Sequence, residues 1–319
     1  MAYTAGDTIL DDEYNTFVNS SSSPFGYNHF AGTGSAQYGL GESSISTVAA
    51  GETILASSWN SLFTGMDTIA GHTADTLTSR SAVSAGDPIA IKAAVAADLA
   101  TLAASVAAGC PNTTATTTSA TLQAPASNST WFGSFTTEVS ATFSSADKMR
   151  HFFNAGGKIR IDPVRTGNGG DSGASGIDGA WDNLYNAVGN LDIGSQSTTR
   201  SGTGETLTTD GLSNGFHDLG TGYTTLLKLT DDSYPYQSNT VEIQAKLNAA
   251  VGTAITITVK TIAIDGTANY TYSDPSADNN AYRNGQHEHR LISINTTTGG
   301  GLANAYAPSS TAVVSNTTT

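Results

Sequence analysis

The chain is short of charge, of cysteine and of long apolar runs, and each shortage excludes a class of protein. Only 13% of its 319 residues are charged, about half of the roughly 25% that is typical of soluble domains. The 13 Lys and Arg residues are too few for a basic stripe, so we expect no nucleic-acid partner. No stretch of about 18 apolar residues exists, so we expect no membrane-spanning helix. The single cysteine, Cys110, excludes an internal disulfide framework and a cysteine-based zinc site.

Small polar residues are abundant instead. Ser and Thr together make up about a quarter of the chain, and there are 34 glycines. The net charge of −14 is spread thinly, which indicates solubility rather than an acidic interaction tail. The N-terminus has neither a basic region nor an apolar core, so we expect no secretory signal and synthesis in a cytoplasm.

An internal repeat organises the first third of the chain. Residues 5–17 match residues 50–62, and a partial third copy covers residues 85–99. Similarity at a fixed offset indicates a repeated supersecondary unit. Each copy reads as a Gly-Asp or Gly-Glu turn, a short apolar pair and a helix. Large apolar residues recur at i, i+3 and i+4, so we expect the repeats to pack through Tyr14, Phe17, Trp59 and Leu62.

The composition predicts an α+β protein in four regions. Residues 1–109 form a small helical repeat region, and residues 110–130 form a Thr/Ser/Ala-rich linker without the apolar content of a core. Residues 131–298 form a β-rich α+β domain with a few short helices. The tail, residues 299–319, is expected to be flexible or bound to a partner.

Two patterns after the linker are clear. Residues 131–163 read as strand–helix–strand, with the helix at residues 146–154 ending before the C-cap pair Gly156-Gly157. Residues 254–264 give the clearest strand pattern, with alternate residues on one face: Ile255, Ile257, Val259, Thr261 and Ala263.

Two motifs suggest ligands. The glycine-rich loop at residues 167–176 lacks the phosphate-loop pattern and the EF-hand spacing, so we interpret it as a surface loop. His287 and His289 would share one face of a strand. In a trimer, three such pairs would offer six nitrogens to a metal on the axis, as in trimeric phage fibres. The simpler interpretation is a strand end with solvated histidines.

We expect no catalysis and no cofactor. Cys110 has no histidine near it in the sequence, and no nucleophile constellation stands out. Tyr234 and Tyr236 could stack on sugar rings, although alternating tyrosines on a strand usually pack across strands.

The repeat resembles units in the N-terminal regions of virion structural proteins of tailed bacteriophages. That group is often described as tail or tail-fibre proteins, of the marine and T4-like myophage type. The Phe-Phe-Asn-Ala-Gly-Gly segment at residues 152–157 and the strings at residues 239–245 and 255–259 are similar to the same group. The resemblance covers roughly residues 5–70 and 140–265, and it implies a part of the particle without catalytic residues.

Two function hypotheses follow. The first is a virion structural protein, a tail, baseplate or fibre-attachment component that assembles symmetrically with identical subunits and other virion proteins. Such a protein is assembled in the host cytoplasm and resides in the virion, with no membrane partner; capsid decoration is a weaker variant. The alternative is a carbohydrate-binding receptor module on a phage fibre, in which Tyr234 and Tyr236 contact a host surface glycan.

Overall fold

The computed structural model has an α+β fold whose chain divides into two compact units. Unit 1 contains residues 1–117, 150–157 and 295–306, and unit 2 contains residues 118–149, 158–294 and 307–319. The structure describes the following residues: 11–22, 25–31, 39–73, 75–87, 92–108, 110, 116–122, 130–131, 133–166, 175–234, 236–266, 283–284, 286–296 and 306–318.

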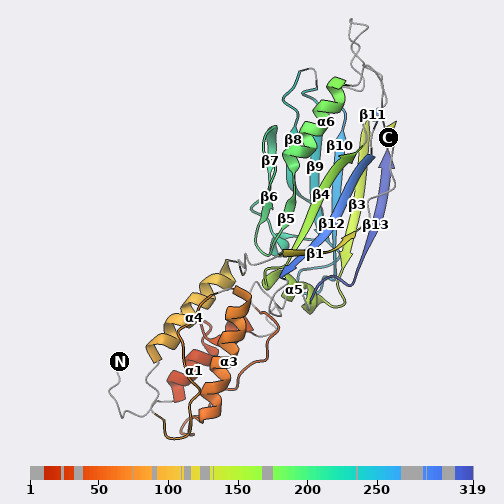
Figure 1. Ribbon diagram of the computed structural model, residues 1–319. Helices are drawn as coiled ribbons and strands as arrows, with labels where there is room; N and C mark the ends of the chain where they lie inside the picture. Colours follow the sequence, from red (N-terminus) through yellow and green to blue (C-terminus); the bar gives the residue numbers. More distant parts are fainter. Residues whose placement is uncertain are drawn as a thin grey trace, which may run out of the picture. The chain divides into compact units, whose positions relative to one another are not determined.

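Unit 1 is built from helices that pack against one another (Figure 1). Its helices are α1 (Asp11–Asn19), α2 (Tyr27–Ala31), α3 (Ala56–Thr73) and α4 (Lys92–Ala107), together with the second half of α5 (Ala146–Asn154). Acidic residues fill the first turn of α1, where they complement the positive end of the helix dipole. The Ala-rich α4 buries one face through Val95, Leu99, Leu102 and Val106, which follow helical spacing.

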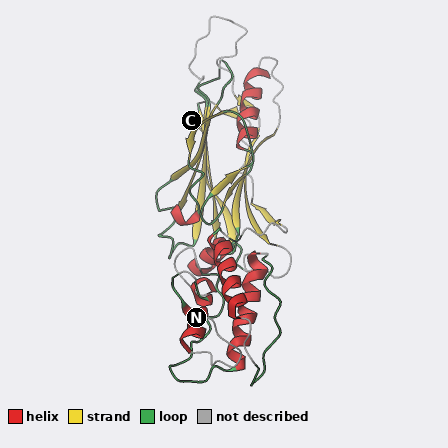
Figure 2. Ribbon diagram, turned by 90° about the vertical axis from the view of Figure 1, so that its left-hand side faces the viewer, coloured by secondary structure: helices red, strands yellow, loops and turns green. Residues whose placement is uncertain are grey.

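Unit 2 contains two antiparallel sheets that lie in two layers (Figure 2). The strand order of the five-stranded sheet is β1-β12-β4-β5-β6, and that of the six-stranded sheet is β13-β3-β10-β9-β8-β7. The strands of the first sheet are β1 (Thr116–Leu122), β4 (Lys158–Thr166), β5 (Leu191–Ile193), β6 (Thr198–Arg200) and β12 (Gln286–Thr296). Those of the second are β3 (Ser134–Thr142), β7 (Thr206–Asp210), β8 (Thr224–Thr230), β9 (Thr240–Leu247), β10 (Thr256–Ile264) and β13 (Ser310–Thr318).

Three short elements and one helix complete unit 2. A two-stranded ribbon pairs β2 (Thr130–Trp131) with β11 (Arg283–Asn284), and η1 (Phe216–Asp218) is a single 3-10 turn. Helix α6 (Ser175–Val188) contacts β4 of one sheet and β8 and β9 of the other. Its buried side chains Trp181, Leu184 and Val188 therefore join the core of the unit.

Strand β10 confirms the strand predicted at residues 254–264. Ile257, Val259, Thr261 and Ala263 are all buried and face inward. Val259 lies opposite Val139 of β3 and Ala245 of β9, so the apolar positions of three strands form continuous cross-strand rows. Ile255 precedes the strand and is 37% exposed, so the predicted face is one residue too long.

The predicted strand–helix–strand unit is confirmed as β3, α5 and β4, with the helix at the predicted residues. Gly156 follows the helix at a φ of 85°, as a left-handed cap requires. The two strands lie in different sheets, so the unit connects the two layers.

The structure differs from the expected regions at two places. Residues 116–122 of the predicted linker form strand β1 beside β12, and residues 310–318 of the predicted tail form β13, which pairs with β3 along its length. Both segments are poor in apolar residues, but a strand can be held by backbone hydrogen bonds to a well-packed neighbour. The boundary expected near residue 109 lies instead at residues 117 and 118, and unit 1 also takes in residues 150–157 and 295–306.

Part of the glycine-rich loop, residues 167–174, lies outside the described residues. Helix α6 begins at Ser175, within the residues predicted as a surface loop. Among the helices that the structure describes, none is both long and apolar enough to cross a bilayer.

Candidate functional site

The four residues expected to pack the repeats lie together in unit 1. The rings of Tyr14 and Trp59 meet edge to face with centroids 5.3 Å apart, and Phe17 lies 6.1 Å from Trp59. Tyr14 and Trp59 are buried, as is Leu62 one turn further along α3. The hydroxyl of Tyr14 donates to the carbonyl of Ser58, 3.1 Å away, so α1 is tied to α3 by both packing and hydrogen bonding.

The asparagine that follows Tyr14 and the asparagine that follows Trp59 each bind an extended segment. Nδ2 of Asn15 donates to the carbonyl of Val48 and Oδ1 accepts from the N–H of Val48, both at 2.8 Å. Asn60, the matching residue of the second copy, makes the same two bonds to Val83, at 3.0 and 2.9 Å. Because a side-chain amide has one donor and one acceptor side, it can replace the neighbouring strand that an extended segment lacks.

A third pair of this kind occurs outside the repeat. Tyr27 is buried, and the next residue, Asn28, binds the carbonyl and the N–H of Ile45 at 2.8 and 2.9 Å. We call the three sites, Asn15 with Val48, Asn28 with Ile45 and Asn60 with Val83, the asparagine clamps. The aromatic–Asn dipeptide recurs visibly in the sequence, but the segments that the asparagines bind carry no pattern of their own.

Each clamp of the repeat lies just before a turn that leads to the next helix. The turn after Val48 has Gly51 at a φ of 83°, and the turn after Val83 has Gly86 at a φ of 94°. The carboxylates of Glu52 and Asp87 accept from backbone N–H groups three residues earlier. The third copy has Ala94 and Val95 where the second has Trp59 and Asn60, so α4 carries no clamp at that position.

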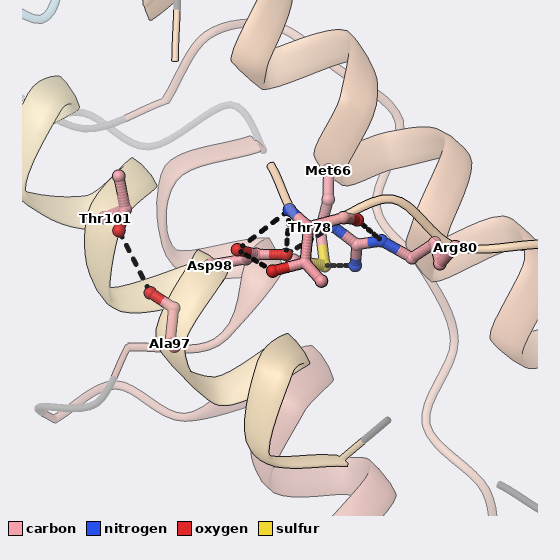
Figure 3. A network of polar contacts seen from close by, with 6 residues as sticks. All are labelled: Met66, Thr78, Arg80, Ala97, Asp98 and Thr101. Carbon is pink, nitrogen blue, oxygen red and sulfur yellow. Dashed lines mark hydrogen bonds and ion pairs between the residues drawn. The ribbon is translucent and has the colours of Figure 1, made fainter. Parts of the chain in front are cut away.

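An ion pair holds the segment between α3 and α4 (Figure 3). Nη2 of Arg80 lies 2.6 Å from Oδ2 of Asp98, and both side chains are less than a tenth exposed. The same carboxylate accepts from the N–H and the hydroxyl of Thr78, at 3.1 Å each. The guanidinium also donates to the carbonyl of Thr78 and lies 5.3 Å from the ring centroid of Phe63. Removing one partner of a buried pair typically costs about 3–5 kcal/mol, so this network holds residues 78–80 firmly against the middle of α4.

A depression of about 440 Å³ lies beside that network, lined in part by Asp67, Asp75 and Arg80. Oδ1 of Asp75 accepts from the hydroxyl of Ser105, 3.1 Å away. Cys110 is buried, and burial together with the charge of Asp75 raises the pKa of its thiol to about 12. The thiol is therefore protonated near neutral pH, which argues against a nucleophilic role.

The outer face of the six-stranded sheet is polar. Lys260 and Glu138 lie opposite each other on β10 and β3, with Nζ and Oε1 3.1 Å apart. Lys228 and Glu242 form a similar pair across β8 and β9, at 3.3 Å. The ring centroid of Tyr223 lies 3.7 Å from Nζ of Lys260. Burial raises the pKa of the Tyr223 hydroxyl. These charges compensate one another across strands, as on a structural sheet face.

The remaining candidates are scattered. His287 and His289 lie in β12, in register with Arg165 and Pro163 of β4, and their side chains lie outside what the structure describes. Tyr234 and Tyr236 lie in the connection between β8 and β9, where Tyr234 is 74% exposed and Tyr236 is half-buried. In the described part of the chain, no three His, Cys, Asp or Glu side chains come together as a metal site would require.

The candidate site with the most complete geometry is thus the clamp and ion-pair system of unit 1. Most of its polar side chains bind the protein's own backbone. The arrangement therefore holds extended segments against helices. Comparison with models of known protein families, with curated proteins and with solved structures gave no match.

Proposed function

We propose that this chain is a structural subunit of a bacteriophage virion, a tail, baseplate or fibre-attachment component that acts by symmetric assembly and not by catalysis. The observation that carries the proposal is the pair of matching clamps at Asn15 and Asn60. They belong to the strings that resemble phage virion proteins, and in this chain those strings build structure.

Unit 1 is, in this proposal, a helical repeat domain. The turn, the aromatic residue and the clamp asparagine recur together in the first two copies, and Trp59 joins them through its contact with Tyr14. The third copy keeps the turn at Gly86 and a helix but lacks the aromatic–Asn pair. It would therefore end the array, as terminal repeats commonly do.

Unit 2 supplies the self-associating surface. The six-stranded sheet ends in β13 on one side and β7 on the other. Val314 on β13 is 54% exposed and Leu207 on β7 is 43% exposed. An edge strand with an exposed apolar side chain favours pairing with another chain, and a closed symmetric ring or trimer of identical subunits would cover it.

Negative-stain electron microscopy of the purified protein tests this proposal. We expect class averages with closed rotational symmetry, threefold or sixfold. Single, asymmetric particles of one 32.6 kDa chain at every concentration would contradict it.

One observation favours a second candidate function, a carbohydrate-binding receptor module. Tyr234 has the largest exposed fraction, 74%, among the large apolar side chains of the described residues, and an exposed ring in a loop can stack on a sugar. We expect Tyr234→Ala to abolish binding on a glycan array while the oligomer persists. A variant that binds glycans as the parent does would remove this candidate.

A further inference from the structure

Three polar residues lie side by side at one end of the six-stranded sheet. Thr230 of β8 pairs with Thr240 of β9, and Thr240 pairs with Ile264 of β10. One step beyond these pairs stand Asp231, Asn239 and Asp265, which therefore occupy one cross-strand row. The N–H of Asp231 donates to the carbonyl of Asn239 at 3.1 Å, so the pairing continues to this row.

The side chains of this row point into the protein. Leu229, Val241 and Ala263, two residues away along each strand, are all fully buried on the inner face, and residues two apart share a face. Asp231 is 2% exposed, Asn239 is 0% exposed and Asp265 is 4% exposed. Two carboxyl groups and an amide are thus buried at the end of the sheet.

Most polar atoms of the first two residues lack a hydrogen bond. Oδ1 of Asp231 accepts from the N–H of Ser233 at 2.6 Å, but its Oδ2 has no partner. Neither Oδ1 nor Nδ2 of Asn239 has one. A buried polar group without a partner costs about 1–3 kcal/mol, and more when it is charged. Native proteins rarely leave such groups unsatisfied, so this row requires a ligand, an ion or a water molecule.

The backbone around the row is built for close approach. A Cβ on Gly266 would lie only 2.2 Å from the carbonyl oxygen of Ser238. Only glycine therefore lets the end of β10 lie so close to the start of β9. This contact sets Asp265 and Asn239 beside each other.

The charge of the surroundings is negative. Glu205 and Asp232 adjoin the row, and Oε2 of Glu205 accepts from the N–H of Asp232 at 2.7 Å. Burial raises the pKa of Asp231, and the charge of Asp232 raises it further. A buried carboxylate among acids is stabilised best by a positive charge.

We propose that this row binds a hard divalent cation, Ca²⁺, between Oδ2 of Asp231 and Oδ1 of Asn239, with the carboxylate of Asp265 contributing charge from the next strand. Carboxylate and amide oxygens are the ligands that Ca²⁺ prefers, and water completes its shell of six to eight oxygens. The site uses an amide as its third group, which is why no triad of acidic or imidazole side chains marks it. Ca²⁺ would fix the ends of β8, β9 and β10 to one another.

Calorimetric melting of the full-length protein in EDTA and in 10 mM CaCl₂ tests the site. With a dissociation constant of about 0.1 mM, we expect Ca²⁺ to raise the Tm of the unit 2 transition by roughly 5 °C or more. We also expect Tb³⁺, a Ca²⁺ analogue, to give emission sensitised by the protein's aromatic residues, which Ca²⁺ displaces. The absence of both effects in the parent protein would overturn the proposal.

Three variants locate the effect. Asp231→Asn and Asn239→Ala should each lose most of the Ca²⁺-induced shift. The matched control Asp67→Asn removes the same charge at an exposed residue of unit 1, and it should keep the shift. Asn239→Ala should also be at least as stable as the parent in EDTA, because it removes two unsatisfied buried atoms.

The same measurements distinguish a cation from a buried water molecule. A water would leave the parent protein indifferent to Ca²⁺ and would make Asn239→Ala equally destabilising in both buffers. An equal Ca²⁺ shift in all variants would indicate nonspecific binding to the acidic surface. Either result would overturn the proposal.

Discussion

At the scale of single residues, the helices of unit 1 use adjacent side chains for two tasks. Consecutive residues of a helix point about 100° apart, so the aromatic ring of Tyr14, Tyr27 or Trp59 enters the core while the next asparagine faces the helix flank. There the amide meets a chain segment that has no strand partner. The clamps thus satisfy backbone groups that would otherwise lack hydrogen bonds close to the core.

Removing a clamp should destabilise unit 1 measurably. Asn60→Ala leaves the N–H and the carbonyl of Val83 without their partner, and Asn15→Ala does the same at Val48. We expect each to lower the free energy of unfolding by about 2–3 kcal/mol in urea titrations. Ser61→Ala, an exposed position on the same helix, should change it by less than about 0.5 kcal/mol. Equal effects of Asn60→Ala and Ser61→Ala would contradict this role.

Cys110 predicts a pH dependence of stability. The pKa of its thiol rises from 9.0 to about 12 on folding. Below pH 9 the thiol is protonated in both the folded and the unfolded protein. Above pH 9 the thiol of the unfolded protein releases its proton while that of the folded protein keeps it, so the free energy of unfolding falls as the pH rises. Between pH 7 and pH 10 we expect the parent to lose about 1.4 kcal/mol more than Cys110→Ala does in urea unfolding. If the free energies of unfolding of the parent and of Cys110→Ala change in parallel with pH, the thiol ionises equally in the folded and unfolded protein.

The packing residues could be predicted from the sequence, but the clamps could not. Tyr14, Trp59 and Leu62 follow a helical spacing that is visible locally. The partner of Asn15 lies 33 residues away in an extended segment without a pattern of its own. Likewise, Asp231 and Asn239 look like ordinary loop residues until the strand register places them in one row.

At the scale of elements, the turns before α3 and α4 depend on glycines with positive φ. Ordinary residues adopt the left-handed conformation of Gly51 only at a cost of about 1–2 kcal/mol. No atom lies within 4 Å of a Cβ placed there, so the backbone alone would determine the effect.

Substitutions at two glycines test the backbone conformation alone, because a Cβ would meet no atom at either position. Gly51→Ala should lower the Tm, whereas Gly71→Ala, in helix α3 with equally open space, should raise it by stabilising the helix by up to about 1 kcal/mol. Thermal melts followed by circular dichroism measure both. If the two variants shift the Tm in the same direction, the turn does not require the left-handed conformation.

Elements with their own periodicity were predictable, and elements defined by a neighbour were not. Strand β10 alternates and α5 carries a cap, so both follow from local sequence. Strand β13 has one strong apolar pair, Val313-Val314, and its register shifts between Val313 and Ser315. Its placement depends on β3, which lies about 170 residues earlier in the chain.

At the scale of the whole molecule, the chain does not divide into domains in sequence order. Unit 1 includes Phe152 and Phe153, which are fully buried, and Asn154, whose Nδ2 donates to the carbonyl of Gly39 at 3.0 Å. The Phe-Phe-Asn-Ala-Gly-Gly string thus contributes to the helical unit although it follows strands β1 to β3 in the sequence. Composition could not reveal this, because the contact joins residues 115 positions apart.

Symmetric assembly predicts that the edge strands of unit 2 are covered by other copies of the chain. Val314→Lys places a charge on exposed β13 and should weaken the oligomer. Tyr234→Lys, at an exposed loop position of the same unit, is the matched control and should leave the oligomer intact.

Light scattering after gel filtration measures the molar mass of the assembly in solution. For the parent protein we expect a single mass that is a whole multiple of 32.6 kDa, three or six times that value, and a lower mass for Val314→Lys. A folded protein with the mass of one chain at all concentrations would contradict assembly with identical subunits.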